Sequence, residues 1–411
     1  MFKILRKIEK ELSPNDSLSI NQSVTNDTFN IQYADRSQSQ VRYITDNFLL
    51  SNATIHSLQM GLALNTSVSI GILGLSYAIG EASATIYPNI MASLFSQNLI
   101  STKAFSLYLD SVSSSTGSIL FGAIDTTKFI GELAAIDIVP QPIWNGSITN
   151  SAFAIELVGM GITDQGGNIK NFTSSPAVVV LDSGAMITTL PANLTSSIFK
   201  YFNAYDDTGS TGNVYIPCLL LNTSSSLTIN YLFSSSSVST TIKIPLSELF
   251  FPLTNPIYAL REGDNVPDLP FSGEACGFGI WTGSDGNYVL GDTFLRSAYV
   301  VYDLENNQIG LAQANFEDSN VSSSLNTGTG SIVELKAGET SIPALSGECL
   351  SSSATMSERL STSTSLMEPK PTSSESQPST EKATQTGKSD AATPISRSIE
   401  IRILCFMVLE D

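Results

Sequence analysis

One aspartate of this sequence stands where a carboxylate could do chemistry. Asp182 follows the apolar run at positions 177–181 and precedes Ser183 and Gly184. The run predicts a strand that is buried on both faces, and Ser-Gly predicts a tight turn directly after it. Turn amides and hydroxyls would then hold the Asp182 carboxylate, which makes it a candidate catalytic group. The alternative is a strand-end aspartate that only caps the turn amides.

The composition excludes several other kinds of catalytic site. His56 is the single histidine among the 411 residues, whereas Ser/His, Cys/His and His-rich zinc sites all need an imidazole beside another specific group. Its neighbours predict an exposed turn or strand end. No group of Asp and Glu residues has the spacing of a calcium-binding loop. We therefore expect no metal and no cofactor, and any hydrolysis would depend on carboxylates.

Charge and length narrow the class further. The formal net charge is −18, and the 20 Lys and Arg residues are spread along the chain. A nucleic-acid partner needs clustered basic residues, so we expect none. With 42% apolar residues, a chain of this length can bury a large core and form two or three domains.

The elements that must position Asp182 are mostly strands. From about residue 28 to residue 316, short apolar or alternating runs are separated by Gly, Asn, Asp and Ser turns, which predicts an all-β region. The best short helices are predicted at 88–99 and 194–202. From about residue 317 the composition turns to Ser, Thr, Pro, Gly and Glu without apolar periodicity. That composition predicts a disordered tail with no core of its own.

Several features indicate an oxidising compartment. Cys218 and Cys276 both lie in the β-rich region, and we predict a disulfide between them, with two buried free thiols as the alternative. Ten Asn-x-Ser/Thr acceptors support secretion and glycosylation; they begin at Asn15, Asn21, Asn26, Asn52, Asn65, Asn145, Asn171, Asn193, Asn222 and Asn320. The first twelve residues are charged throughout, so we expect no signal peptide on this chain.

The last segment, 399–411, is apolar enough to suggest a lipid-anchor signal. Glu400 and Arg402 interrupt it, two acidic residues end it, and the clean apolar run 403–409 is short. We therefore expect no membrane anchor on the chain as given.

The segment 179–191, which contains Asp182, resembles the second active-site motif of the pepsin-like aspartic endopeptidases, peptidase family A1. Other landmarks of that family follow in the same order: a flap hairpin at 33–37, two hydrophobic-hydrophobic-Gly segments at 71–75 and 288–295, and lobe ends at 117–133 and 299–312. The resemblance runs from about residue 29 to residue 316. The Ser/Thr-rich extension and the cysteine placement are most similar to the fungal yapsin- and candidapepsin-type enzymes.

The resemblance implies an all-β, bilobal fold with an incomplete first lobe. We expect an atypical segment at 1–27, a partial N-terminal lobe at 28–138, a C-terminal lobe at 139–316 and the disordered tail at 317–411. The resemblance also implies a monomer that acts on protein or peptide substrates and is secreted or held at the cell wall. Tyr33, Asp35 and Ser37 would belong to the flap that closes over the substrate.

The chemistry of this family requires two aspartates, one from each lobe, that share a proton. Asp182 matches one of them. Asp16 and Asp27 lie in polar sequence and precede no Gly, and Asp207 begins an Asp-Thr-Gly triplet that no apolar strand precedes, which predicts a surface turn. We therefore expect the first catalytic strand and loop to be missing, as in an N-terminally truncated enzyme. The chain as given is expected to be proteolytically inactive.

Two substitutions distinguish the chain from the family pattern. Ser183 and Gly184 retain the family's loop residues, but Ala185 replaces the Thr or Ser whose hydroxyl donates to the catalytic carboxylate, and Arg36 replaces a Gly usual at the flap tip.

Two other functions remain open. The protein could be a pseudoprotease that binds peptides without cleaving them, or a non-enzymatic glycoprotein of the cell wall or surface.

Overall fold

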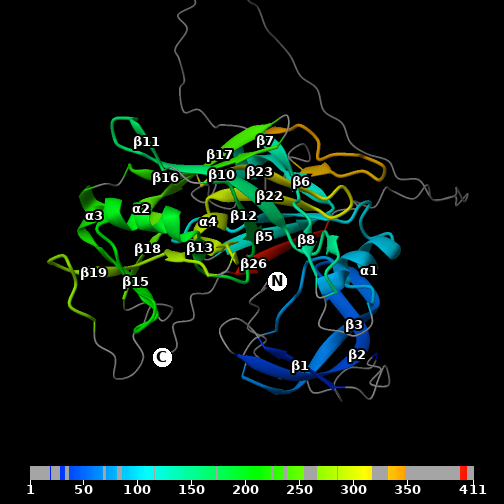
Figure 1. Cartoon of the computed structure of the whole chain (residues 1–411). Coiled ribbons are helices and arrows are strands. Elements are labelled where there is room, and N and C mark those ends of the chain that lie inside the picture. Colours follow the sequence, from blue (N-terminus) through cyan, green and yellow to red (C-terminus); the bar gives the residue numbers. More distant parts are fainter. Residues whose placement is uncertain are drawn as a thin grey trace, which may run out of the picture. The chain divides into compact units, whose positions relative to one another are not determined.

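The structure is a computed structural model of the whole chain (Figure 1). It describes residues 19, 28–32, 37–67, 71–80, 86–114, 116–143, 145–172, 175–223, 226–235, 238–253, 266–284, 286–316, 332–347 and 399–404. The chain divides into two units, Met1–Glu348 with Arg397–Asp411, and Cys349–Ser396. Every described residue belongs to the first unit, and most of the secondary structure is β, as the sequence predicts.

The first three strands form an antiparallel sheet of their own. These strands are β1 (Thr28–Gln32), β2 (Gln38–Leu50) and β3 (Ala53–Thr66), in the order β1-β2-β3. Alternating exposed and buried residues at the start of β2 give the sheet one apolar face, where Tyr43 stacks on Phe29 at 4.4 Å between ring centroids. His56 lies in β3 and is exposed, which confirms the prediction of a surface histidine.

A seven-stranded sheet joins distant parts of the chain, in the order β25-β7-β23-β22-β4-β5-β26. Its strands are β4 (Ala104–Tyr108), β5 (Thr116–Phe121), β7 (Phe129–Asp137), β22 (Ala298–Asp303), β23 (Gln308–Ala314), β25 (Ser346–Gly347) and β26 (Ile399–Leu404). Every residue of β4 and β22 is buried, and Phe105 stacks on Tyr302 at 4.7 Å. This pairing shows how strands nearly two hundred residues apart make one core.

Part of the expected disordered tail is ordered, so that expectation is wrong for residues 332–347. β24 (Ile332–Glu334) pairs with β6 (Ala123–Asp125), and β25 (Ser346–Gly347) pairs with β7. Leu335, 2% exposed, and Ile342 are buried in the cluster beneath these strands. Local periodicity could not reveal this segment. It is held by strand pairing with β6 and β7, some two hundred positions earlier in the chain, and by the burial of Leu335 and Ile342.

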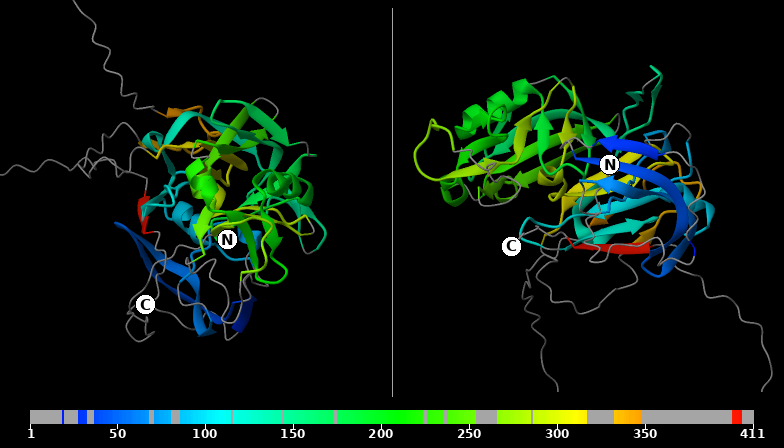
Figure 2. Two further views of the ribbon diagram at one scale, coloured as in Figure 1. Left: turned by 90° about the vertical axis from the view of Figure 1, so that its left-hand side faces the viewer. Right: turned by 90° about the horizontal axis from the view of Figure 1, so that it is seen from below.

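The segment considered as an anchor also contributes a strand. β26 (Ile399–Leu404), red in Figure 2, pairs antiparallel with β5 at one edge of the seven-stranded sheet. Among the described residues, no helix is long and apolar enough to span a membrane.

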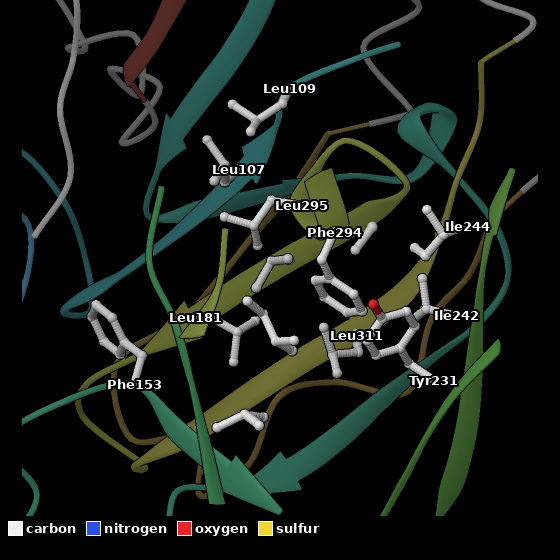
Figure 3. Close-up of a cluster of buried hydrophobic side chains, with 14 of the residues drawn as sticks. Leu107, Leu109, Phe153, Leu181, Tyr231, Ile242, Ile244, Phe294, Leu295 and Leu311 are labelled. Atoms are coloured by element: carbon white, nitrogen blue, oxygen red, sulfur yellow. The ribbon is translucent and has the colours of Figure 1, made fainter. Parts of the chain in front are cut away.

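A second large sheet carries the candidate site, with the strand order β17-β16-β10-β12-β21-β13-β20 and β11 paired to β10. Its strands are β10 (Ala154–Thr163), β11 (Ile169–Phe172), β12 (Ala177–Leu181), β13 (Thr188–Leu190), β16 (Thr228–Ser234), β17 (Ser239–Pro245), β20 (Ile280–Thr282) and β21 (Val289–Leu290). Figure 3 shows Leu181, at the end of β12, in the same buried cluster as Phe294 and Leu295.

Two smaller sheets complete the β structure. One has the order β14-β15-β19-β18, and the other pairs β8 with β9. Their strands are β8 (Gln141–Pro142), β9 (Ile148–Thr149), β14 (Tyr205–Asp207), β15 (Asn213–Pro217), β18 (Phe250–Pro252) and β19 (Ala275–Phe278).

The described helices are short. The α-helices are α1 (Ile90–Ser96), α2 (Ala192–Phe202), α3 (Leu219–Thr223) and α4 (Asp292–Leu295), and the 3-10 helices are η2 (Ala78–Gly80), η3 (Thr126–Lys128) and η4 (Leu246–Glu248). The two predicted helices correspond to α1 and α2. α1 begins after Asn89, whose side-chain oxygen accepts the Ala92 N–H at 3.1 Å and so caps the helix.

The predicted disulfide is present. Cys218 and Cys276 are bonded across a sequence separation of 58, with their Cα atoms 5.1 Å apart, and they tie the residue after β15 to β19. By the chain-entropy model, closing a loop of this length stabilises the fold by about 4 kcal/mol. Cys349 and Cys405 lie outside the described residues.

Candidate active site

Asp182 is delivered by a strand in the interior of its sheet. β12 is antiparallel to β10 on one side and parallel to β21 on the other, with Leu181 opposite Leu290. Val179 and Leu181 are fully buried, whereas Val178 and Val180 are only partly buried. The strand expected before Asp182 is therefore present, but only one of its faces is fully buried rather than both. The Asp182 N–H donates to the Leu290 carbonyl at 3.1 Å, so the backbone leaves the sheet directly after this pair.

The turn after β12 closes on Asp182 itself. The Gly184 N–H donates to Asp182 Oδ1 at 2.8 Å, and the Ala185 N–H donates to the Asp182 carbonyl at 3.1 Å. Residues 182–185 are partly buried, while Met186 is 47% exposed. The side chain at 185 is a methyl group and has no hydroxyl to donate. A hydrogen bond to a charged group, worth about 1.5–3 kcal/mol, is therefore not available from this position.

The segment after β21 packs directly on the Asp182 turn. The Asp292 N–H donates to the Ala185 carbonyl at 2.8 Å, and the Thr293 N–H donates to the Met186 carbonyl at 3.2 Å. A Cβ at Gly291 would collide with the main-chain oxygens of Ala185 and Ile187, so this close approach requires glycine. The start of α4 is therefore hydrogen-bonded to the end of the turn, at Ala185 and Met186.

Asp292 is a second carboxyl group near Asp182, and it is not among the site residues predicted from the sequence. Its Oδ1 is excluded from solvent and accepts no hydrogen bond from any residue that the structure describes. Burial raises the pKa of Asp292 to about 7. The positive charge of Arg296 opposes this rise, and the negative charge of Asp182 adds to it. At acidic pH this carboxyl is therefore neutral. The signal was present in the sequence, because Asp292 ends the run Val-Leu-Gly-Asp within a family landmark.

The charges of Asp182 and Asp292 also affect the pKa of a buried tyrosine, Tyr302. The hydroxyl of Tyr302, in the middle of the core, has a pKa raised first by burial and then by the charges of Asp182 and Asp292. Tyr302 therefore stays protonated at every pH at which the protein would work.

The other predicted site residues fall in different places. Ser37 directly precedes β2, in the connection between β1 and β2, whereas Tyr33 and Asp35 lie outside the described residues. Asp207 ends β14 and begins a hairpin turn, as expected, and its carboxylate accepts the Thr211 hydroxyl at 2.8 Å. Within the described ranges, no group of three or more His, Cys, Asp or Glu residues could hold a metal ion.

Comparison with known proteins supplies the family. A family model described as "Eukaryotic aspartyl protease" matches residues 7–314. The probable aspartic-type endopeptidase opsB of Aspergillus fumigatus is 35% identical over 326 residues, which cover 77% of this chain and 60% of the relative. Candidapepsin-3 of Candida albicans is 32% identical over 310 residues, which cover 75% of this chain and 68% of that protein. The chain thus spans about three fifths of the opsB relative's length.

A solved structure supports the same fold. The crystal structure of the aspartic proteinase from Irpex lacteus matches 71% of this chain and 82% of its own chain, with a TM-score of 0.54 and 20% sequence identity. At this identity the likeness shows the fold alone. The family model and the similar fungal sequences carry the assignment further: this chain belongs to the eukaryotic aspartyl protease family of pepsin-like enzymes.

Proposed function

We propose that the Asp182 turn is the catalytic loop of an aspartic endopeptidase that acts on extended peptides at acidic pH. The observation that supports this role is the placement of Asp182 at the end of an interior strand, with the Gly184 amide on its carboxylate. Ser183 and Gly184 support the loop. Tyr33, Asp35 and Ser37 would form the flap, because they lie in sequence between Gln32 and Gln38, the pair at which the described pairing of β1 with β2 ends.

We also propose that residues 1–411 do not complete hydrolysis by themselves. The reaction needs an ionised carboxylate to activate water and a protonated one to polarise the scissile carbonyl. Asp182 would supply one of these groups. The other Asp-Ser/Thr-Gly triplet in the sequence, at Asp207, is a hairpin turn. Asp292 is close to Asp182, but its Oδ1 is closed to solvent and we assign it no contact with substrate.

The test is an assay of the purified chain on acid-unfolded haemoglobin or casein, with and without pepstatin. We expect no cleavage that pepstatin inhibits, and no difference between the wild type and Asp182→Asn. Pepstatin-sensitive cleavage by the wild type that Asp182→Asn abolishes would keep the loop assignment and overturn the proposed inactivity.

A second candidate function is peptide binding without turnover. It is favoured by the turn around Asp182, which is held by hydrogen bonds from the Gly184 and Ala185 amides although Ala185 offers no hydroxyl. Fluorescence anisotropy of a labelled extended peptide would detect binding, and chromatography of the same sample would show whether the peptide is intact. Binding with an intact peptide supports this function, whereas the absence of binding at acidic and neutral pH rejects it.

We further propose that the protein is a secreted, monomeric glycoprotein held at the cell surface. Six of the ten glycan acceptors lie in the described residues and all six are exposed: Asn52, Asn65, Asn145, Asn171, Asn193 and Asn222. The disulfide agrees with an oxidising compartment. A relative that is 32% identical over 310 residues is named secreted aspartic protease 3 of Candida albicans. A loss of apparent mass after endoglycosidase treatment of the native protein is the expected result, and an unchanged mass would contradict it.

A further inference from the structure

A buried carboxylate far from Asp182 in sequence gathers three separate segments. Glu248, the last residue of η4, is 3% exposed, so its charge needs partners inside the protein. Arg296 supplies two hydrogen bonds, from Nε to Glu248 Oε2 at 2.8 Å and from Nη2 to the Glu248 carbonyl at 3.0 Å. The Val112 N–H donates to the same carboxylate, at 2.9 Å from Oε2. Val112 lies in the loop between β4 and β5, and Arg296 directly follows α4.

The side chain of Val112 reinforces this junction. It packs in a small apolar cluster with Ile187 and Phe251, and the Arg296 guanidinium lies over the Phe251 ring at 5.7 Å. Ile187 follows the Asp182 turn in sequence and is buried. The loop between β4 and β5 thus touches the segment that leaves the turn.

Arg296 reaches the turn by a second route. Its own N–H donates to the Asp292 carbonyl at 3.0 Å, which closes the first turn of α4. Asp292 and Thr293 in turn donate main-chain hydrogen bonds to Ala185 and Met186. A continuous series of hydrogen bonds therefore runs from Glu248 through Arg296 and α4 to the Asp182 turn.

The loop that meets Glu248 is itself held in an unfavourable conformation. Asp110 has a φ of 63° although it is not glycine, and it is only 4% exposed. Its Oδ1 accepts the Ser111 N–H at 2.7 Å. A non-glycine residue rarely adopts this left-handed conformation, and such strain persists where the surroundings impose it. Two residues after Asp110, the Val112 N–H is held by the Glu248 carboxylate.

We infer that Glu248 and Arg296 are positioning residues for the Asp182 turn, and that with Val112 they form a latch between the β4–β5 loop and α4. We call these three residues the Glu248 latch. The inference rests on the proposed catalytic role of the Asp182 turn. It predicts that loosening the latch displaces the turn, although no latch residue contacts the carboxylate of Asp182.

The latch should also respond to pH. Burial raises the pKa of Glu248, and the nearby charge of Asp110 adds to that effect, while Arg296 and the Val112 N–H oppose it. Protonation removes the negative charge that strengthens the hydrogen bonds from Arg296 and the Val112 amide, and the raised pKa places this change at a higher pH than in a free glutamate.

The test compares Glu248→Ala and Glu248→Gln with the control Glu305→Ala, which removes an exposed carboxylate paired with Lys103 at 3.2 Å. Nuclear magnetic resonance would follow two amides, Val112 in the latch and Gly184 on the Asp182 carboxylate. In Glu248→Ala we expect both resonances to move and the amides of residues 110–114 to exchange at least tenfold faster. Glu248→Gln retains an acceptor, so it should restore part of the protection, and its Val112 resonance should lose the wild-type pH dependence. The control should show neither change.

An unchanged Gly184 resonance in folded Glu248→Ala would overturn the inference, as would an equal change in the control. If Glu248→Ala does not fold, Arg296→Lys takes its place, because lysine keeps the charge but cannot make the two guanidinium hydrogen bonds; an unmoved Gly184 resonance in that variant also overturns it. No readout depends on peptide cleavage. The inference and the proposed function can therefore fail separately.

Discussion

Asp182 and Asp207 begin the same kind of triplet, Asp followed by Ser or Thr and then Gly, in opposite surroundings. Asp182 follows β12, which has a neighbouring strand on each side, whereas Asp207 ends β14, an edge strand of a small sheet. The Asp182 carboxylate accepts a hydrogen bond from a main-chain amide, and its charge raises the pKa of a second carboxyl group, Asp292. The Asp207 carboxylate accepts a hydroxyl from its own turn.

The strand before the triplet therefore decides the surroundings of the aspartate more than the triplet itself does. An interior strand brings the aspartate to segments that are remote in sequence, such as Leu290 and Asp292. A short edge strand leaves the aspartate with neighbours only a few residues away, such as Thr211. The first arrangement can bring two carboxyl groups together, and the second only closes a hairpin.

The largest effect on stability is expected from a glycine substitution beside the Asp182 turn, because the Asp182 turn is tightly packed and the Asp207 hairpin is not. Gly291→Ala would drive a methyl group into the carbonyls of Ala185 and Ile187, whereas at Gly209 nothing lies within 4 Å of an added Cβ. We expect Gly291→Ala to lower the free energy of unfolding by about 5 kcal/mol or to prevent folding. Gly209→Ala should change it by less than about 0.5 kcal/mol. Urea unfolding of both variants measures the difference, and equal stabilities would contradict the packing described for the Asp182 turn.

The second-largest effect is a dependence of the protein's stability on pH, caused by Asp292. The pKa of Asp292 rises from its ordinary value of 3.8 to about 7 in the folded protein. A raised carboxyl pKa means that the folded state holds its proton more tightly than the unfolded state does. The resulting stability is complete below the unfolded value and is lost as the pH rises through about 7. The loss is at most about 4 kcal/mol.

Asp292→Asn removes this titration. Thermal unfolding across the acidic to neutral range should show a shallower decline in this variant than in the wild type. A variant whose stability declines as steeply as that of the wild type would show that another group causes the loss.

The smallest stability effect is expected in the Asp207 hairpin. The Thr211 hydroxyl donates to Asp207 Oδ2 at 2.8 Å and accepts the Tyr215 hydroxyl at 2.9 Å. Thr211→Val removes both hydrogen bonds and should lower the free energy of unfolding by about 1–2 kcal/mol. The resonance of Gly184 should stay where it is in the wild type. A displaced Gly184 resonance would contradict this expectation, because it would show that the two triplets are coupled.

The sequence predicts local parts of the site and misses the long-range ones. The strand 177–181, the turn at Ser183 and Gly184 and the hairpin at Asp207 follow from neighbouring residues, because apolar runs and turn residues act over short distances. The Glu248–Arg296 pair and the approach of Asp292 depend on strand pairing across the sheet. The ordered segment 332–347 also depends on long-range pairing, with β6 and β7, and no local sequence pattern predicts it. The assignment of 28–138 and 139–316 to two lobes stays a prediction.

The most direct test of the comparison measures peptide binding by the wild type, Asp182→Asn and Asp207→Asn in parallel at acidic pH. Each substitution removes one carboxylate charge and keeps the side-chain shape, so the two variants control for each other. The account predicts at least tenfold weaker binding for Asp182→Asn, equivalent to about 1.4 kcal/mol, and wild-type binding for Asp207→Asn. Equal losses in both variants, or a loss in Asp207→Asn alone, would contradict it.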